Sequence, residues 1–220
     1  MDGDGSIQVN HWRKKSLQYR LIIKLNNCKE NSYMLTLIAN TIGGKVRYVN
    51  KNHFVIWVVD SKKSIMNIIT IFNDFPPLTS RLNCQIKFLL ECFKRNDVEW
   101  YLKERNYKYS QRSKIQSGIV IDYSYFNEWL SGFCEAEGCF SIRQNTFSSF
   151  SIGQNDDKYL INAIRTHFNI QSLIRNPSKT FWLIETYRIS TLHNIIQHFT
   201  VYPLLGEKKI SFNKFKDLIK

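Results

Sequence analysis

Two short acidic turns contain the residues best suited to chemistry. Residues 2–5 (DGDG) and residues 135–138 (EAEG) share the pattern acid, any residue, acid, glycine. Carboxylate oxygens are preferred ligands of hard cations such as Mg²⁺, and paired sites of this kind can activate a water and stabilise a leaving oxygen in a hydrolysis reaction. Taken alone, Asp4 would be only a residue of an N-terminal turn, and Glu137 only a water-exposed carboxylate at a helix end.

The two turns belong to an internal repeat. Residues 65–72 (IMNIITIF) match residues 192–199 (LHNIIQHF) at an offset of 127, the difference between 192 and 65. The acidic turns align at an offset of 133, the difference between 138 and 5, and loops of unequal length explain the drift. Shared polar positions are not required by helix amphipathicity, so the sequence predicts a duplicated module.

A second matched feature is a proline followed five residues later by a basic side chain. Pro76 and Arg81 align with Pro203 and Lys208 at the offset of 127, each pair near the start of an expected helix. Arg81 and Lys208 taken singly would be ordinary surface bases. Their matched placement favours a role at a site.

The repeat divides the chain into a first module at residues 1–93, a linker at residues 94–122 and a second module at residues 123–220. The linker is rich in charge and poor in aliphatic residues, and is expected to be partly helical. Each module should contain alternating strands, a helix, two further strands and closing helices. In the first module we expect a helix at residues 31–42, followed by strands at residues 45–49 and 53–59. In the second module we expect a helix at residues 158–168, followed by strands at residues 172–176 and 180–187. The fold class is α+β, two tandem pseudo-symmetric modules, each an antiparallel sheet with helices on one face and a free polar face.

Composition indicates a polyanionic partner. Lys and Arg number 31 against 18 Asp and Glu, which gives a formal net charge of +13. The five cysteines show neither a disulfide framework nor zinc spacing and are expected to be free thiols. No apolar run reaches the length of a membrane span or a signal-peptide core, so no membrane partner is expected. The histidines show no ligand spacing, and His193 and His198 are expected on a helix surface.

Residues 127–142 (NEWLSGFCEAEGCFSI) resemble the LAGLIDADG motif, with residues 130–138 on its nine positions and a strand directly after it. In the first module only residues 2–5 fall on the last four motif positions, so this motif is expected to be truncated at its N-terminus. The matched proline and basic residue are the family's second recurrent feature. The resemblance covers nearly the whole chain, and the sequence is identified as a member of the LAGLIDADG homing endonucleases and their intron maturase relatives.

The resemblance implies a catalytic site. In the family, two motif helices pack along a pseudo-twofold axis and each delivers one carboxylate to DNA; here these are Asp4 and Glu137, which would bind Mg²⁺ shared with the scissile phosphates. Asp2 and Glu135 would be structural. Arg81 and Lys208 would lie near the phosphates and hold charge or a water network, and Arg81 replaces the usual Lys, which could slow cleavage of one strand.

The glycine that ends the motif, Gly138, is expected to terminate the helix with a positive φ. DNA recognition is expected on the free sheet faces, because a β-ribbon fits the major groove. The candidate DNA-binding residues are Gln8, Asn10, Arg13, Lys14, Gln18, Arg20, Lys45 and Arg47 in the first module and Ser141, Arg143, Asn145, Ser149, Ser151, Arg175, Asn176 and Lys179 in the second.

The resemblance implies a site-specific endonuclease that makes a metal-dependent double-strand break in intron homing. Two alternatives stay open: a maturase-like RNA-binding protein that assists splicing of a group I intron, and a catalytically inactive, truncated remnant. A monomer with pseudo-twofold symmetry is expected if the first motif is completed upstream, and a homodimer otherwise. The abundance of Asn, Ile and Lys is typical of AT-rich organellar genomes, which favours the mitochondrion, with the chloroplast as the alternative.

Overall fold

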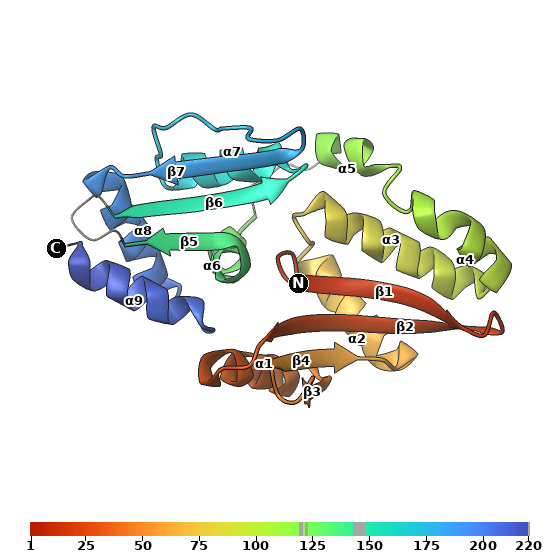
Figure 1. The fold of residues 1–220 in the computed structure, drawn as a ribbon. Coiled ribbons are helices and arrows are strands. Elements are labelled where there is room, and N and C mark those ends of the chain that lie inside the picture. The colour runs from red at the N-terminus through yellow and green to blue at the C-terminus, as the bar shows by residue number, and fades with distance from the viewer. Residues whose placement is uncertain (119–120, 122, 143–147, 220) are drawn as a thin grey trace. The chain divides into compact units, whose positions relative to one another are not determined.

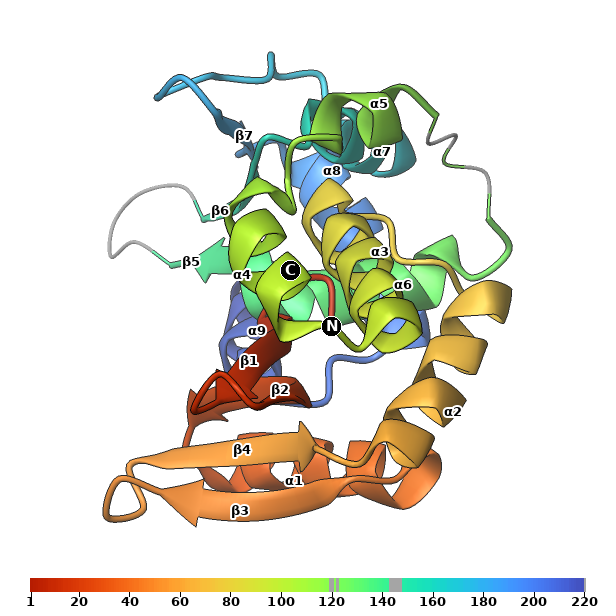
Figure 2. The same cartoon turned by 90° about the vertical axis from the view of Figure 1, so that its right-hand side faces the viewer.

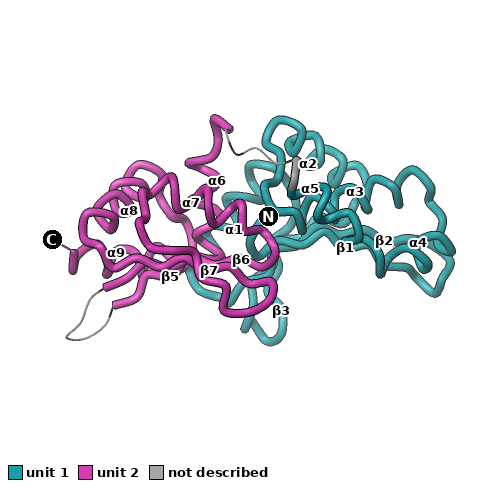
Figure 3. Tube along the Cα trace, turned by 90° about the horizontal axis from the view of Figure 1, so that it is seen from above, with its two compact units in different colours: residues 1–119 teal, residues 120–220 magenta. Residues whose placement is uncertain are grey.

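The computed structural model of the protein describes residues 1–118, 121, 123–142 and 148–219. The chain forms two compact units, Met1–Ile119 and Val120–Lys220, and each combines an antiparallel sheet with helices (Figure 1). Figure 3 colours the two units separately.

The first unit is built on a four-stranded sheet in the order β1-β2-β4-β3. Its strands are β1 (Gly5–Trp12), β2 (Ser16–Asn26), β3 (Lys45–Val49) and β4 (Phe54–Val59), and all neighbouring pairs are antiparallel. Alternation in β4 directs Val55, Trp57 and Val59 into the core, where each is at most 2% exposed. The face of the sheet that carries these side chains is therefore apolar and buried.

The first unit also contains helices, and some of them pack on that apolar face. The helices are α1 (Lys29–Ile42), α2 (Lys62–Asp74), α3 (Ser80–Arg95), α4 (Val98–Glu104), the 3₁₀ helix η1 (Arg105–Tyr107) and α5 (Arg112–Gly118). Helix α1 packs on β3 and β4 (Figure 2), and α3 packs beside β1 (Figure 1). Residues expected to form a linker thus fold as α4, η1 and α5 within the first unit.

The second unit has a three-stranded sheet in the order β5-β6-β7. Its elements are α6 (Phe126–Glu137), β5 (Gly138–Ser141), β6 (Ser149–Asn155), α7 (Lys158–His167), β7 (Phe181–Thr186), α8 (Ile189–Val201) and α9 (Lys208–Leu218). Aromatic side chains dominate its core, among them Phe133, Phe150, Phe199 and Phe215, each at most 1% exposed. The bounds of α2 and α8 differ by the same 127 residues as the sequence repeat.

The strand expected at residues 172–176 is wrong: only an isolated bridge joins Arg175 to Leu183. Pro177 follows directly, has no N–H to donate and restricts the residue before it. The Nδ2 of Asn176 donates to the carbonyl oxygens of Ser178 and Phe181, 2.7 and 2.8 Å away. These bonds close a turn instead of a strand.

Across the described part of the chain, the helices are too short or too polar to cross a bilayer. All five cysteines are free thiols, as expected from their spacing.

Candidate active site and nucleic-acid interface

The first acid of the N-terminal turn is buried against a helix. Asp2 is 9% exposed, and its carboxylate accepts the backbone N–H groups of Leu78 and Thr79 at 3.2 and 2.9 Å as well as the Thr79 hydroxyl. Thr79 is the N-cap of α3, where amide groups without helical partners and the helix dipole favour a negative charge. Asp2 therefore ties the acidic turn to the start of α3.

Glu135 makes the matching contacts in the second unit. Its carboxylate accepts the backbone N–H groups of Leu205 and Gly206, both at 3.1 Å, and that of Lys208 at 2.9 Å. Helix α9 begins at Lys208. Asp2 thus bonds to the start of α3 and Glu135 to the start of α9, two helices that align in the sequence repeat. This agrees with the structural role implied for both acids.

The second acid of each turn lies at the base of a strand. Asp4 is exposed directly before β1, and Glu137 is a half-buried residue at the end of α6, directly before β5. Each is followed by a glycine at a point of close approach. A Cβ on Gly5 would lie 2.6 Å from the Met1 Cα, and one on Gly138 would lie 2.7 Å from the Cys134 carbonyl oxygen.

The expected positive φ at Gly138 is wrong, because its backbone is extended, with φ −73° and ψ 146°. The chain leaves α6 straight into β5, so no left-handed residue is needed. Glycine is required here by lack of space, not by conformation.

Arg81 lies in α3 and donates hydrogen bonds to the backbone of the first acidic turn. Its Nη1 donates to the Gly5 carbonyl oxygen at 2.7 Å. Its Nη2 is within 2.7 Å of the carbonyl oxygens of Asp2 and Gly3 and 3.3 Å from that of Met1. The planar guanidinium presents donors in a fixed fork that an ammonium cannot reproduce. The side chain thus encloses the backbone on both sides of Asp4.

Lys208 is aligned with Arg81 but bonds differently. Its backbone N–H contacts Glu135, and its half-buried side chain lies near the Cys134 thiol. Burial raises the pKa of Cys134, and the charge of Lys208 partly offsets that rise. The two matched bases therefore have different surroundings.

A chain of hydrogen bonds crosses the second unit from the motif helix. Ser131 of α6 donates its hydroxyl to the Tyr202 carbonyl oxygen at 2.8 Å, and its Oγ is 3.3 Å from the His198 Nε2. The His198 Nδ1 is 3.1 Å from the His167 Nε2. The expectation that His198 lies on a helix surface is wrong, because it is 7% exposed. His193, in contrast, is exposed.

Burial lowers the pKa of His167 and of His198, the two histidines joined by these hydrogen bonds. The pKa of His198 falls to about 4, mainly through desolvation and secondarily through His167, whose own pKa is also lowered by burial. Neutral rings fit the bonding: each can donate from one nitrogen and accept at the other.

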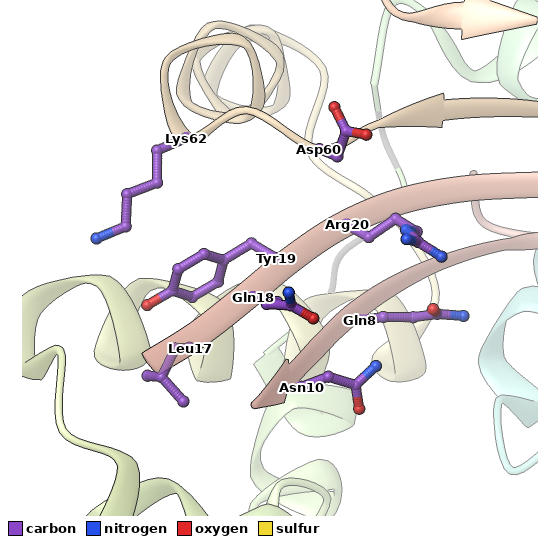
Figure 4. Close-up of a pocket in the computed structure, with 8 residues that line it drawn as sticks. All are labelled: Gln8, Asn10, Leu17, Gln18, Tyr19, Arg20, Asp60 and Lys62. Atoms are coloured by element: carbon purple, nitrogen blue, oxygen red, sulfur yellow. The ribbon is translucent and has the colours of Figure 1, made fainter. Parts of the chain in front are cut away.

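Polar side chains from β1 and β2 share the open face of the first sheet. Gln8 pairs with Arg20 and Asn10 pairs with Gln18 across the two strands. They border a groove of about 420 Å³ beside β2, where Asp60 and Lys62 lie across that strand from Gln8 and Asn10 (Figure 4). Here β2 extends beyond its pairing with β4, which ends at Leu21.

The same face continues onto β3. Lys45 and Arg47 pair with Val58 and Ile56 of β4, which pair in turn with Ile22 and Lys24 of β2. Arg47 is 3.7 Å from Asp60 in an exposed ion pair. Lys24 was missed by sequence reasoning, although the two-residue alternation from Gln18 and Arg20 would have identified it.

The tip of the β1–β2 hairpin is basic. Arg13 and Lys14 are exposed and have φ values of 47° and 56°. This left-handed backbone normally favours Gly or Asn, so two bases hold a conformation that hairpin turns usually assign to other residues.

The open face of the second sheet is less basic than expected. Ser141 pairs with Ser149, and Ser151 pairs with Glu185, which was not a candidate. Ser149 is only 1% exposed and lies 3.3 Å from a Glu185 carboxylate oxygen. Ser149 was expected to contact DNA, but it is covered.

Glu185 also pairs with Arg175. Burial alone would raise the pKa of Glu185, but hydrogen bonds from Tyr187 and Arg175 and the Arg175 charge lower it. Asn176 uses its amide in the turn described above, and Lys179 is exposed. Arg143 and Asn145 lie outside the described residues.

The comparisons with known proteins agree with this duplicated architecture. The model of the LAGLIDADG endonuclease family matches residues 1–92 and again residues 130–219. The chain therefore belongs to the LAGLIDADG endonuclease family.

Similar relatives are named as probable intron-encoded endonucleases aI3. The Dictyostelium citrinum protein is 48% identical over 99% of this chain and 91% of its own length. The Dictyostelium discoideum protein is 44% identical over 98% of this chain and 92% of its own. The Debaryomyces hansenii protein is 47% identical over 98% of this chain, which spans only 36% of that longer protein.

Solved structures share the fold. The LAGLIDADG homing endonuclease I-GzeII in complex with its DNA target matches with a TM-score of 0.76 at 20% identity, over 99% of this chain and 86% of that one. The meganuclease I-AabMI bound to uncleaved DNA matches with a TM-score of 0.74 at 19% identity, over 99% and 87%. These matches confirm the expected α+β fold of tandem modules.

Proposed function

We propose that the protein is a site-specific DNA endonuclease that makes a metal-dependent double-strand break at an intron insertion site. One observation carries the proposal: the acidic turn is anchored in the same way in both units, by Asp2 at the start of α3 and by Glu135 at the start of α9. The names of the relatives and the DNA-bound state of the structural neighbours support it.

Asp4 and Glu137 are proposed to hold Mg²⁺, one acid at each scissile phosphate. Both offer hard oxygen ligands, and both follow an anchored first acid. No group of three or more His, Cys, Asp or Glu side chains suited to a metal occurs among the described residues. Protein sites commonly hold Mg²⁺ through one or two carboxylates together with substrate phosphates and water. When bound, the cation supplies a polarised water and neutralises charge on the leaving oxygen.

The chain's own residues position this chemistry. Arg81 is proposed to fix the backbone that carries Asp4, since its guanidinium donates hydrogen bonds to carbonyl oxygens of the acidic turn. Lys208, whose ammonium makes no such clamp to backbone among the described residues, is proposed to face a phosphate or its water network. The two halves would then treat the two DNA strands unequally.

The open sheet faces are proposed to read the DNA target. In the first unit Gln8, Asn10, Gln18 and Arg20 form a polar surface with the amide and guanidinium groups that pair with adenine and guanine edges. Lys45, Arg47 and the added candidate Lys24 continue it. In the second unit the proposal is carried by Ser141, Ser151, Arg175 and Lys179, with Glu185 as an acceptor from cytosine.

The gene is proposed to be mitochondrial. The relatives include fungal and Dictyostelium intron-encoded proteins, and a Saccharomyces cerevisiae protein named as mitochondrial, RF1, is 31% identical over 101 residues. The chloroplast alternative has no support among these relatives. Group I intron RNA as a partner and the choice between monomer and homodimer stay predictions from the sequence.

The function is tested with plasmid DNA that carries the sequence spanning the intron insertion site. The protein should linearise this plasmid in Mg²⁺, leave a plasmid with a scrambled site intact, and stop cutting when EDTA is added. Specific binding without any cutting, in the presence of Mg²⁺ or Mn²⁺, would contradict the endonuclease assignment and favour the splicing alternative.

A further inference from the structure

A second polar cavity lies along the outer edge of β1. It has a volume of about 560 Å³, and β1 residues from Ser6 to Asn10 form one wall. Arg105, Asn106 and Lys108 come from η1 and the turn after it. No acidic side chain is among the described residues that line the cavity.

Two tyrosines connect the basic side chains of this cavity to strand β1. The Arg105 guanidinium carbon is 6.0 Å from the centroid of the Tyr101 ring, and the Tyr101 hydroxyl donates to the Val9 carbonyl oxygen at 2.7 Å. Tyr101 is 4% exposed. The Arg105 guanidinium therefore lies beside the Tyr101 ring, and the hydrogen bond to β1 holds that ring in place.

Lys108 is supported in a similar way. Its Nζ is 5.0 Å from the Tyr109 ring centroid, and the Tyr109 hydroxyl accepts a hydrogen bond from the Gln85 amide at 3.0 Å. The Gln85 Oε1 accepts the backbone N–H of Ile7 at 2.9 Å. Arg105 and Lys108 thus each lie beside a tyrosine ring. One tyrosine is hydrogen-bonded directly to the edge of β1, and the other is hydrogen-bonded to it through the Gln85 side chain.

These bonds also decide what the cavity can bind. The N–H of Ile7 and the carbonyl of Val9 already have partners, so the edge of β1 is closed at these groups to an added strand. The cavity instead presents two cations, and the described salt bridges include neither Arg105 nor Lys108. Its ligand should therefore be an anion.

The neighbouring side chains indicate which anion. Gln8 and Asn10 line this cavity and also the groove on the open face, so the two sites adjoin across β1. A β-ribbon that reads bases in a major groove about 12 Å wide has its flank towards the groove wall, where the phosphates lie. Cations on that flank meet the backbone of the same duplex.

We propose that Arg105 and Lys108 form a phosphate-binding site for the DNA backbone, beside the base-reading face of β1 and β2. The inference rests on the proposed DNA-binding function and extends it to a segment that sequence reasoning treated as a linker. The site would fix the position of the first unit on the duplex without reading sequence.

The test is the salt dependence of DNA binding. The double variant Arg105→Ala/Lys108→Ala should reduce the magnitude of the slope of log K against log[salt] by about 1 to 2, because each lost phosphate contact removes about 0.9. The loss of affinity should be similar for a target duplex and for a scrambled duplex of equal length. Arg105→Lys/Lys108→Arg should keep the wild-type slope.

The matched control is Lys63→Ala/Lys87→Ala, which removes the same charge from exposed positions on α2 and α3. A slope change no larger than in this control overturns the inference, and so does a loss confined to the target duplex or to an RNA duplex. If the wild-type protein binds neither DNA duplex, the proposed function itself fails. Unchanged thermal unfolding of the variants verifies that they are folded.

Discussion

Arg81 and Lys208 align in the sequence, yet their side chains have different partners. The spacing from the proline predicted a matched basic pair, and nothing in that spacing distinguishes a base that faces a substrate from one that binds carbonyl oxygens. The difference depends on where the acidic turn passes α3, a long-range contact between residues 76 to 80 positions apart. A tertiary contact of this kind has no signature in local sequence.

Arg81→Met tests the clamp, because it keeps an apolar stem and removes the donors to the turn. We expect cleavage in the half served by Asp4 to slow by about 10²-fold, as for loss of one preorganised polar group, while target affinity changes little. Nicked plasmid should accumulate before the linear form. Arg81→Lys should recover only part of the rate, since an ammonium cannot form the fork.

A clamp that serves folding alone would behave differently. In that case Arg81→Met would lower thermal stability and the cleavage of both strands together. Equal loss on both strands would contradict the assignment of Arg81 to the first turn.

His198 predicts a pH dependence of stability. Its pKa is about 4 in the folded protein, below the value of about 6.5 of an unperturbed histidine, so the unfolded chain binds the proton more tightly. Stability is therefore fully present above about pH 6.5 and falls as the pH drops towards 4, by up to about 1.4 kcal/mol per pH unit for this group. His167 adds to the fall in the same direction.

Chemical denaturation at several pH values checks this expectation. His198→Gln should flatten the fall in unfolding free energy between pH 6.5 and pH 4, whereas His193→Gln, an exposed histidine on the same helix, should retain it. The same pH slope in His198→Gln and in the wild type would contradict the account.

At the scale of elements, alternation and helix signals predicted most of the fold. The strand expected at residues 45–49 is β3 in the structure, and the helix expected at residues 31–42 lies within α1. The failure at residues 172–176 has a local cause in Pro177 and in the Asn176 side chain. The position of α4 and η1 could not be predicted, because it depends on long-range bonds: Tyr101 donates to β1, and Tyr109 accepts from Gln85, which in turn bonds to β1.

Tyr101→Phe tests the link between α4 and β1. The variant keeps the ring under Arg105 and removes the hydroxyl that donates to Val9, so a carbonyl at the sheet edge loses its partner. We expect a loss of about 1 to 2 kcal/mol of unfolding free energy and faster hydrogen exchange of β1 amides. The control Tyr107→Phe alters an exposed tyrosine of η1; equal effects of the two substitutions would contradict the link.

At the scale of the whole molecule, the sequence repeat is the strongest feature. The family model matches twice, and the two units differ in how basic their open faces are. The first sheet carries Arg20, Lys24, Lys45 and Arg47, whereas the second pairs Arg175 with Glu185. Composition gave the net charge of +13 but not its division between two faces, since an acid such as Glu185 is assigned to a face only when its strand register is known.

The most direct test of the account measures cleavage and binding together for Asp4→Asn, Glu137→Gln and the double variant. Each substitution removes a negative charge with little change in shape, so both single variants should bind target DNA about as well as the wild type. We predict that each loses linearisation of the plasmid by at least about 10²-fold and that the double variant neither nicks nor cuts. Cleavage by the double variant at a rate near that of the wild type would contradict the assignment of the two acids.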